Sequence, residues 1–358
     1  MRLYYYLSIT VSMTLLASCT SQEKNVEIKR LGIDINTAHA IPMDTNKIVS
    51  LETNNNSLLY DISGLYELDN KYFIWSRGMV KAFNKSGKYL YQISGKGQGA
   101  NEYTDMSCVY TKDGNICIYD WNVKTVLSFN SQGQLQNRQR ITVEPHAPSP
   151  VGIIPLGKDR YVCVNGYRGG DNVRTPSVSI WNSDFTAQDT LGGRLVESGF
   201  RLSDWLYASA DSKRILYWEP LKDTLFTVAG QTVYPMCAID FGDHAVPADV
   251  AKKDAYARSM YLGKKKNIKK SASMCRFYQI DGDYIYFIFS WAGRICLCRF
   301  SQKTFHPEIF EFKDERYKVL PFFKIIGNQL VMAVEDKEDM EKNCGLLVVD
   351  KKILDKNK

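Results

Sequence analysis

The sequence predicts an all-β protein, a six-bladed β-propeller of four-stranded antiparallel blades with one short helical insertion. Two segments carry this prediction, residues 72–94 (YFIWSRGMVKAFNKSGKYLYQIS) and 116–141 (ICIYDWNVKTVLSFNSQGQLQNRQRI). Both contain an alternating apolar run, a short polar break, a second run that ends in Phe-Asn, a glycine turn and a third run. Gly87 and Gly133 occupy matching turns and lie 46 positions apart (133 − 87). Short alternating strands at a spacing of about 45 residues are typical of propeller blades.

One more apolar run precedes each segment, at residues 65–71 and 109–115, so that each unit has four strands. Weaker copies of the pattern follow, in residues 153–185, 205–242, 275–312 and 322–351. The chain therefore holds six units in all. Because the third unit is irregular, seven blades are the alternative.

The last unit has three clear runs instead of four, and the N-terminal run KIVSLET (47–53) has no partner of its own. We expect this run to supply the missing outer strand and close the ring, because closure removes exposed sheet edges. The propeller is thus expected over residues 45–352. An alanine-rich segment followed by lysines, residues 247–270, predicts a helical and basic insertion between the fourth and fifth blades.

The N-terminus has the order of a secretory signal peptide, with Arg2, an apolar run over residues 3–16 and small residues before Cys19. The apolar run is shorter than the ~20 residues of a membrane span. The small residues and Cys19 resemble the bacterial lipobox, which implies cleavage after residue 18 and a lipid on the Cys19 sulfur. An ordinary signal peptide with an incidental cysteine is the alternative. By analogy with lipoprotein sorting, Thr20 favours the outer membrane, facing the periplasm or the outside. Residues 19–44 predict a polar, irregular tether.

Charge gives limited information about partners. The chain has 46 basic and 39 acidic residues, and loss of Arg2 on cleavage leaves 45 − 39 = +6. Part of the excess is the run Lys264–Lys270 (KKKNIKK). This run is either a solvated loop or a contact with anionic lipid or polysaccharide. Nucleic acid is not an expected partner of an exported lipoprotein.

The cysteines and histidines predict no metal site. Eight cysteines besides Cys19 lie mostly in apolar alternating segments, where a free thiol behaves as a small core side chain. Their spacing determines no disulfide pairing. The four histidines are scattered, and no pair has the spacing of a zinc site. No cofactor is predicted, and calcium binding has no support in the sequence.

Residues 95–104, GKGQGANEYT, raise the question of a phosphate-binding loop. Neither the P-loop pattern nor a dinucleotide fingerprint fits their spacing and context. The segment instead joins the outer strand of one blade to the inner strand of the next. Its glycines are expected to take positive φ, and Glu102 is expected to accept backbone N–H groups. We interpret Gly95, Gly97, Gly99, Glu102 and Tyr103 as a structural crossing between blades.

These residues also carry a family resemblance. FNKSGKYLYQISGKGQGANEY (83–103) resembles the F-d-x-x-G-k-f-l … G-x-G-x-G-P-G-E-Y pattern of six-bladed propeller lipoproteins related to TolB-like and NHL-like propellers. Residues 222–242 resemble a recurring segment of that family, and VSLETNNNSLL (49–59) resembles its first strand. Ala100-Asn101 stands where the family has Pro-Gly. The resemblance implies a propeller fold and export as a lipoprotein, and it implies no single activity.

In a propeller, the connections between blades share one face with the turns between second and third strands. This topology places aromatic and arginine residues on the same side as GKGQGANEYT: Arg77, Trp121, Tyr167, Arg168, Arg174, Trp291 and Arg294. Such groups around a concave mouth suit sugar stacking or anion binding. The alternative is that the tryptophans fill gaps between blades and the arginines are solvated.

The favoured function is a non-enzymatic module of the cell envelope that binds a ligand or a protein. It would act either as a glycan or small-ligand site at the Trp/Arg mouth, or as a scaffold that docks a partner through residues 247–270. A metal-assisted hydrolase or lactonase-type enzyme is the alternative, with Glu102, Asp120, Asn122 and Asp223 as candidate side chains. Nothing in their spacing selects them, and the chain has no G-x-S-x-G motif.

Overall fold

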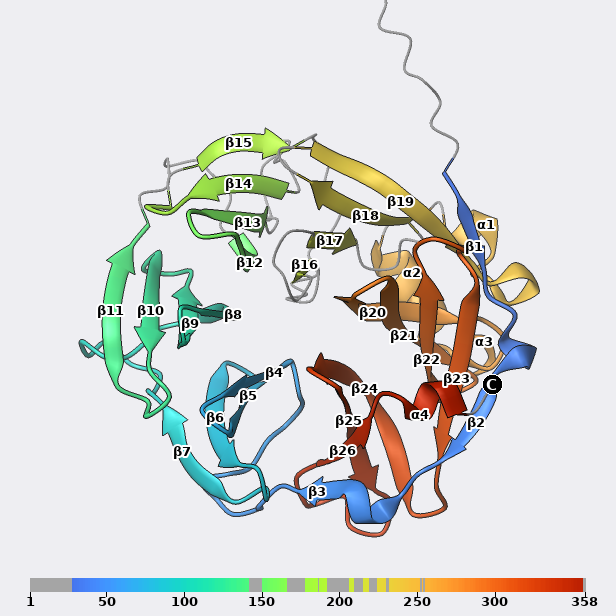
Figure 1. Ribbon diagram of the computed structural model, residues 1–358, viewed down its shortest axis with the longest axis horizontal. Coiled ribbons are helices and arrows are strands. Elements are labelled where there is room, and N and C mark those ends of the chain that lie inside the picture. The colour runs from blue at the N-terminus through green and yellow to red at the C-terminus, as the bar shows by residue number, and fades with distance from the viewer. Residues whose placement is uncertain are drawn as a thin grey trace, which may run out of the picture.

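Six β-sheets stand around a central axis in the computed structural model, each forming one blade of a propeller (Figure 1). The prediction of six blades is confirmed, and the seven-bladed alternative is wrong. The structure describes residues 28–141, 150–165, 178–185, 187–191, 206–208, 215–218, 224–229, 232–251, 253 and 255–356.

Each blade has four antiparallel strands that follow one another outward from the axis. The first blade contains β4 (Gly64–Leu68), β5 (Lys71–Ser76), β6 (Met79–Asn84) and β7 (Tyr89–Ile93), and the second contains β8 (Met106–Lys112), β9 (Asn115–Asp120), β10 (Thr125–Phe129) and β11 (Leu135–Arg140). The third contains β12 (Pro150–Leu156), β13 (Arg160–Asn165), β14 (Val178–Asn182) and β15 (Ala187–Leu191), and the fourth contains β16 (Leu206–Ala208), β17 (Ile215–Trp218), β18 (Thr224–Ala229) and β19 (Thr232–Asp240). The fifth contains β20 (Ser273–Asp281), β21 (Tyr284–Trp291), β22 (Arg294–Ser301) and β23 (Pro307–Lys313), and the sixth contains β24 (Tyr317–Ile326), β25 (Gln329–Asp336), β26 (Gly345–Asp350) and β3 (Ile48–Ser50).

The position of a strand within its blade explains its composition. β5 and β21 are second strands, and each has five consecutive buried residues. Neighbouring blades cover both faces of such a strand, which therefore has a nearly continuous apolar sequence. The outer strand β11 (LQNRQR) has no buried residue, because its side chains face solvent at the rim. The core thus lies between the blades and follows the ring.

The ring is closed by the N-terminal strand, as the sequence predicts. β3 pairs antiparallel with β26, and Ser50 lies opposite Gly345. The turn between β6 and β7 of the first blade packs directly on this strand. A Cβ atom on Gly87 would lie 2.0 Å from the carbonyl oxygen of Ser50, and Gly87 has a φ of +86°. The carbonyl of Gly87 accepts the Glu52 N–H at 2.8 Å. The first blade is therefore packed onto the closing strand.

A buried asparagine holds the chain between β3 and β4. The Asn343 side chain donates to the carbonyl oxygens of Glu52 (2.7 Å) and Ser57 (3.0 Å) and accepts the Leu59 N–H (2.6 Å). The Asn343 N–H donates to Thr53 Oγ1 at 2.8 Å. Asn343 is only 9% exposed, so these contacts exclude water. The last blade is thereby fixed to the segment that enters the first.

Two further N-terminal strands lie on the outer rim. β1 (Arg30–Gly32) pairs in parallel with β19, and β2 (His39–Pro42) pairs in parallel with β23. The fourth and fifth blades each gain a fifth strand in this way. The 3₁₀ turns η1 (Ile35–Thr37) and η2 (Thr45–Lys47) connect these strands to each other and to β3. Leu31, Ile33 and Ile35 are buried against the rim. The segment expected as an irregular tether is therefore ordered sheet and turn from Arg30 onward.

The C-terminal helix α4 (Ile353–Lys356) is bound to the fifth blade by ion pairs. The Arg299 side chain, 3% exposed, donates to Glu308 at 2.8 Å and to Asp355 at 2.9 Å. Lys351 pairs with Asp281 of β20. The rim strand β2 and the C-terminal segment with α4 therefore both hold the fifth blade.

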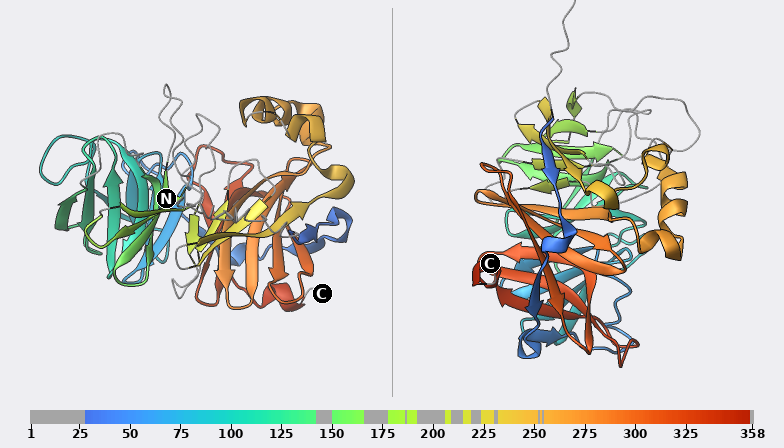
Figure 2. Two further views of the ribbon diagram at one scale, coloured as in Figure 1. Left: turned by 90° about the horizontal axis from the view of Figure 1, so that it is seen from above. Right: turned by 90° about the vertical axis from the view of Figure 1, so that its right-hand side faces the viewer.

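Three short helices occupy the connection between β19 and β20, where the sequence predicts the insertion. They are α1 (Ala248–Ala251), α2 (Ala255–Leu262) and α3 (Lys265–Ile268), and the 3₁₀ turn η3 (Gly242–His244) precedes them. The helices rise from one face of the ring (Figure 2). The buried Asn267 side chain joins α3 to the end of α2 by donating to the Tyr261 carbonyl at 2.8 Å. Within the described residues, no helix has the length and apolar character needed to cross a bilayer.

The cysteines are core side chains wherever the structure describes them. The seven thiols whose side chains the structure describes are free, and all of these except Cys344 are buried. Cys296 and Cys298 lie in the same core cluster. Burial raises the pKa of Cys108 and Cys237 to about 12, so these thiols are unreactive near neutral pH.

Candidate functional site

One face of the ring is formed by the connections between blades and by the turns between second and third strands; we term it the crossing face. Antiparallel order brings both kinds of connection to the same end of each blade. In four blades the structure describes the turn, and there a turn N–H donates to the preceding crossing. The pairs are Arg77 to Asp61 Oδ1 (3.2 Å), Trp121 to Asp105 O (3.2 Å), Ala292 to Ile268 O (3.2 Å) and Lys337 to Arg316 O (3.0 Å). Each of these turns is therefore fixed to the chain that enters its blade.

The segment GKGQGANEYT forms a compact crossing on this face. Glu102 Oε2 accepts the Gly99 N–H at 2.8 Å. The Gly97 N–H donates to the Tyr103 carbonyl at 2.9 Å. The Tyr103 ring is 1% exposed, and its hydroxyl donates to the Gly78 carbonyl at 2.8 Å. Burial raises the pKa of Tyr103 to about 12, so this hydroxyl stays a donor. The segment ties two blades together, and its Gly97, Gly99, Glu102 and Tyr103 N–H groups all donate within the segment.

The expected role of its glycines is wrong. Gly95, Gly97 and Gly99 have no positive φ, and the left-handed residue here is Ser94 with a φ of +54°. Close approach explains the glycine at position 97, because a Cβ there would lie 2.0 Å from Glu102 Oε2. The glycine makes room for the carboxylate that caps the crossing.

We expect Gly97→Ala to lower the free energy of unfolding by about 0.5–1.5 kcal/mol, because Glu102 must move and the exposed Gly99 N–H then exchanges its acceptor for water. Gly95→Ala is the matched control, since a Cβ at Gly95 would meet no atom within 4 Å. The control is expected to be neutral or to stabilise by about 0.4–1 kcal/mol through the unfolded chain. Urea denaturation measures both, and equal losses would contradict the role of Glu102.

Asp120, a candidate for hydrolase chemistry, has a structural position instead. Its side chain is 0% exposed. Its carboxylate accepts the N–H groups of Thr104, Asp105 (3.3 Å) and Asn122 (3.1 Å). The carboxylate therefore joins the end of β9 to the crossing before β8, and it is shielded from substrate. Asp223 lies outside the described residues.

The two described tryptophans of the expected mouth are engaged by neighbours. The indole N–H of Trp121 donates to the Asp105 carboxylate. The guanidinium of Arg294 lies over the Trp291 ring, 4.6 Å from its centroid. The ring of His244 contacts the edge of Trp291 with centroids 5.4 Å apart. Both indoles thus fix parts of the crossing face to each other.

The arginines are likewise paired. Arg294 donates to both carboxylate oxygens of Glu311, at 3.1 and 3.0 Å. Arg77 lies over the ring of Tyr60, 4.9 Å from its centroid. Trp291 and Arg294 are in contact, whereas Arg77 and Trp121 belong to the turns of the first and second blades. The remaining predicted members, Tyr167, Arg168 and Arg174, lie outside the described residues.

Sequence reasoning missed the exposed apolar side chains of the crossing face. Of eight large apolar side chains that are exposed in the described residues, five lie on this face: Tyr60, Val123, Met260, Ile268 and Met340. Met340 is 70% exposed and Met260 53%. Ile28, Leu90 and Tyr234, the other three, lie near the N-terminus and on outer strands. Met340 stands alone in a polar turn and Met260 in the short helix α2, so no periodic sequence pattern marks either as exposed.

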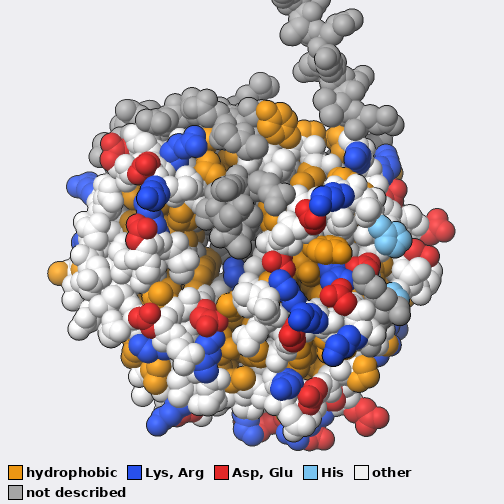
Figure 3. Space-filling model, viewed as in Figure 1, with side chains coloured by type: hydrophobic (Ala, Val, Ile, Leu, Met, Phe, Trp, Pro, Cys, Tyr) orange, Lys and Arg blue, Asp and Glu red, His pale blue; other side chains and the backbone are white. Residues whose placement is uncertain are grey.

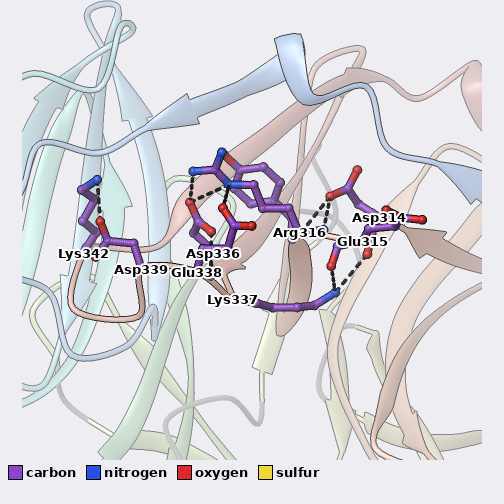
Figure 4. Close-up of polar contacts among 9 residues, drawn as sticks. Asp314, Glu315, Arg316, Asp336, Lys337, Glu338, Asp339 and Lys342 are labelled. Carbon is purple, nitrogen blue, oxygen red and sulfur yellow. Dashed lines mark hydrogen bonds and ion pairs between the residues drawn. The ribbon is translucent and has the colours of Figure 1, made fainter.

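Two regions of opposite charge lie on the crossing face. The insertion, residues 247–270, contains eight Lys or Arg and two Asp, a net charge of +6. Residues 314–316 and 335–342 contain seven Asp or Glu and three Lys or Arg, a net charge of −4. We term these segments the acidic loops (Figure 4). On the opposite face, which Figure 3 shows, basic and acidic side chains are intermixed.

An arginine organises the acidic loops. Arg316 donates to Asp336 at 3.0 and 2.6 Å, and it lies 3.6 Å from Glu338. This hydrogen bond from Arg316 lowers the pKa of Asp336, so its carboxylate is ionised at neutral pH. Lys342 pairs with Asp339 at 2.6 Å. The loops keep an acidic surplus after these pairings, and Met340 is exposed within it.

Residues 40–355 match a family model described as a domain of unknown function, DUF4934. The chain belongs to this family. The match begins in β2 and ends in α4, so the family domain comprises the propeller ring together with its rim strand β2. A search of curated proteins found no match to the sequence.

Solved structures from Bacteroides share the propeller fold of this DUF4934 member. A putative exported protein from Bacteroides fragilis aligns with a TM-score of 0.67 and 16% identity, covering 90% of this chain and 100% of its own. A DUF4221 member from Bacteroides vulgatus aligns with a TM-score of 0.53 and 10% identity, covering 85% of this chain and 96% of its own. At these identities the likeness is one of fold alone.

Proposed function

We propose that this protein is a non-enzymatic interaction module of the cell envelope that binds a protein partner through its crossing face. The carrying observation is that exposed apolar side chains and two regions of opposite charge share this face. Contiguous exposed apolar patches with a polar rim mark interaction sites, and this face has five of the eight exposed large apolar side chains of the described residues. Complementary charges orient a partner and accelerate its docking.

The contacts of the face support a protein partner more than a glycan. Sugar stacking needs an open aromatic face. Within the described residues no tryptophan side chain is exposed, and the exposed Tyr60 ring already has a guanidinium over one face, 4.9 Å from its centroid. Trp121 and Trp291 are occupied by Asp105, Arg294 and His244. A metal-assisted hydrolase also has less support. The described part of the chain holds no group of three His, Cys, Asp or Glu side chains that could hold a metal ion.

Photocrosslinking in intact cells tests the proposal. A photoreactive amino acid is placed at Met260 or Met340 on the crossing face, and at Leu90 on β7 as an exposed apolar control. Specific adducts are expected from Met260 and Met340 and not from Leu90. Adducts of equal yield at the three sites, or none at the crossing face, would refute the proposal.

We also propose that the mature chain is anchored by a lipid on Cys19 in the outer membrane, facing the periplasm or the outside. The lipobox resemblance supports this, as does the description of a protein of the same fold as exported. Kinship with TolB-like and NHL-like propellers stays a prediction. Labelling cells with a fatty-acid analogue tests the anchor, because Cys19→Ala should lose both the label and membrane fractionation. Label retained in that variant would disprove it.

A further inference from the structure

The two charged regions of the crossing face are complementary to each other. The insertion has a net charge of +6 and the acidic loops have a net charge of −4. Each region also presents one exposed methionine, Met260 in the insertion and Met340 in the acidic loops. Each therefore combines a charge of one sign with an apolar contact point, and the two signs are opposite.

Both regions expose charged side chains to solvent, and of those named below only Glu338 has an ion-pair partner among the described residues, Arg316 at 3.6 Å. Lys264, Lys265, Lys266 and Lys269 are exposed on and around α3. In the acidic loops Glu315, Glu338 and Glu341 are exposed. Charges that protrude in this way are screened by salt, so contacts through them depend strongly on ionic strength.

Two complementary regions on one face allow reciprocal contact between identical copies. When two copies stack face to face, their twofold axis lies in the plane between them. If that axis is the perpendicular bisector of the line from the insertion to the acidic loops, each insertion meets the acidic loops of the other copy. Such an isologous contact contains two equivalent pairs of insertion and acidic loops. It leaves neither region free for a third copy, so the assembly ends at a dimer.

We propose that the crossing face binds a second copy of this chain, with the insertion of each protomer against the acidic loops of the other. This inference rests on the proposed function and names its partner. A polyanion, such as an anionic lipid surface or polysaccharide, would engage the insertion alone. It would also be repelled by the acidic loops beside it. A second copy satisfies both regions at once.

Salt dependence is the first test. By sedimentation velocity, residues 20–358 are expected to dimerise at about 0.01 M salt, where the Debye length is about 30 Å, and to dissociate at about 1 M, where it is about 3 Å. The dimer dissociation constant should rise at least about tenfold between these conditions. A protein that stays monomeric at low salt would overturn the proposal.

A charge-swap pair is the decisive test. The insertion variant carries Lys264→Glu, Lys265→Glu, Lys266→Glu and Lys269→Glu, which changes the charge of its insertion from +6 to +6 − 8 = −2. The loop variant carries Glu315→Lys, Glu338→Lys and Glu341→Lys, which changes the acidic loops from −4 to −4 + 6 = +2. Each variant alone should be monomeric, because its two regions then have the same sign. Their equimolar mixture should form a heterodimer, because each insertion again meets loops of opposite sign.

The matched control reverses four exposed lysines on the opposite face: Lys88, Lys158, Lys303 and Lys352. This control is expected to dimerise like the unmodified protein. A mixture that stays monomeric, or a control that fails to dimerise, would overturn the proposal. In that case, adducts from Met260 and Met340 with another protein would leave the proposed function standing. Binding of anionic vesicles by the monomer would instead assign the insertion to a membrane surface.

Discussion

Replacing Gly87 with alanine is expected to destabilise the propeller more than any other single methyl addition discussed above. The new Cβ would lie 2.0 Å from the carbonyl oxygen of Ser50 in β3, and Gly87 has a φ of +86°. Overpacking against an ordered backbone costs about 1–3 kcal/mol, and left-handed backbone costs a non-glycine residue about 1–2 kcal/mol more. The clash is with the strand that closes the ring, so β3 must shift from β26.

Gly114→Ala separates the two effects in this prediction. Gly114 has a φ of +71° in the turn between β8 and β9, but a Cβ there would meet no atom within 4 Å. Gly114→Ala should lower the free energy of unfolding only by the cost of the left-handed backbone, about 1–2 kcal/mol. Urea denaturation of both variants gives the difference in free energy of unfolding. If both variants lose a similar free energy of unfolding, β3 moves away from the new methyl group without cost, and Gly87 has no role in closure.

Asn343→Ala is expected to lower the free energy of unfolding by about 3–4 kcal/mol. Its side chain makes three hydrogen bonds to the backbone between β3 and β4, and it is 9% exposed. Each buried backbone group left without its partner costs about 1–3 kcal/mol. In Asn343→Ala the Leu59 N–H and the Ser57 carbonyl are left without a hydrogen-bond partner. Water reaches these groups only if the closure opens. Hydrogen exchange should therefore speed up in β3 and β26 before other strands.

Asn46→Ala is the control for this second prediction. Asn46 lies in the exposed turn η2, close to the same strand in sequence. A surface change of this kind shifts the free energy of unfolding by less than about 0.5 kcal/mol. If Asn343→Ala falls in the same range, the closure does not depend on this asparagine.

The blades and their closure could be predicted because they depend on local patterns. Alternation, matching turns such as Gly87 and Gly133, and one unpaired run gave the blade number and the role of β3. The rim strands could not be recognised. Leu31, Ile33 and Ile35 alternate, but three residues do not separate a strand from a loop. The partner of Arg30 is Ala238 in β19, which already completes the four strands of its blade, so no unit lacked a run that β1 could supply.

The placement of the candidate site residues on one face was predictable, and their contacts were not. Topology alone assigned Arg77, Trp121, Trp291 and Arg294 to turns on the crossing face. Whether a side chain is free for a ligand depends on neighbours from other segments, such as Glu311 beside Arg294. The glycines of the crossing show the same limit, since the close approach of Glu102 to Gly97 is a property of the folded loop. The opposite charges of the insertion and the acidic loops can be recognised only after each segment has been assigned to a face of the ring.

The pairing of β3 with β26 also sets an order of events in folding. Ser50 and Gly345 are partners across 295 positions (345 − 50), so the sixth sheet can be completed only when almost the whole chain has been made. Contacts this distant in sequence form slowly. A chain that stops before β26 leaves β3 without its partner, and an open strand edge is a template for aggregation. Truncated copies of this protein therefore expose the unpaired strand β3 near their N-terminus. Proteases and chaperones can recognise the copies by this strand.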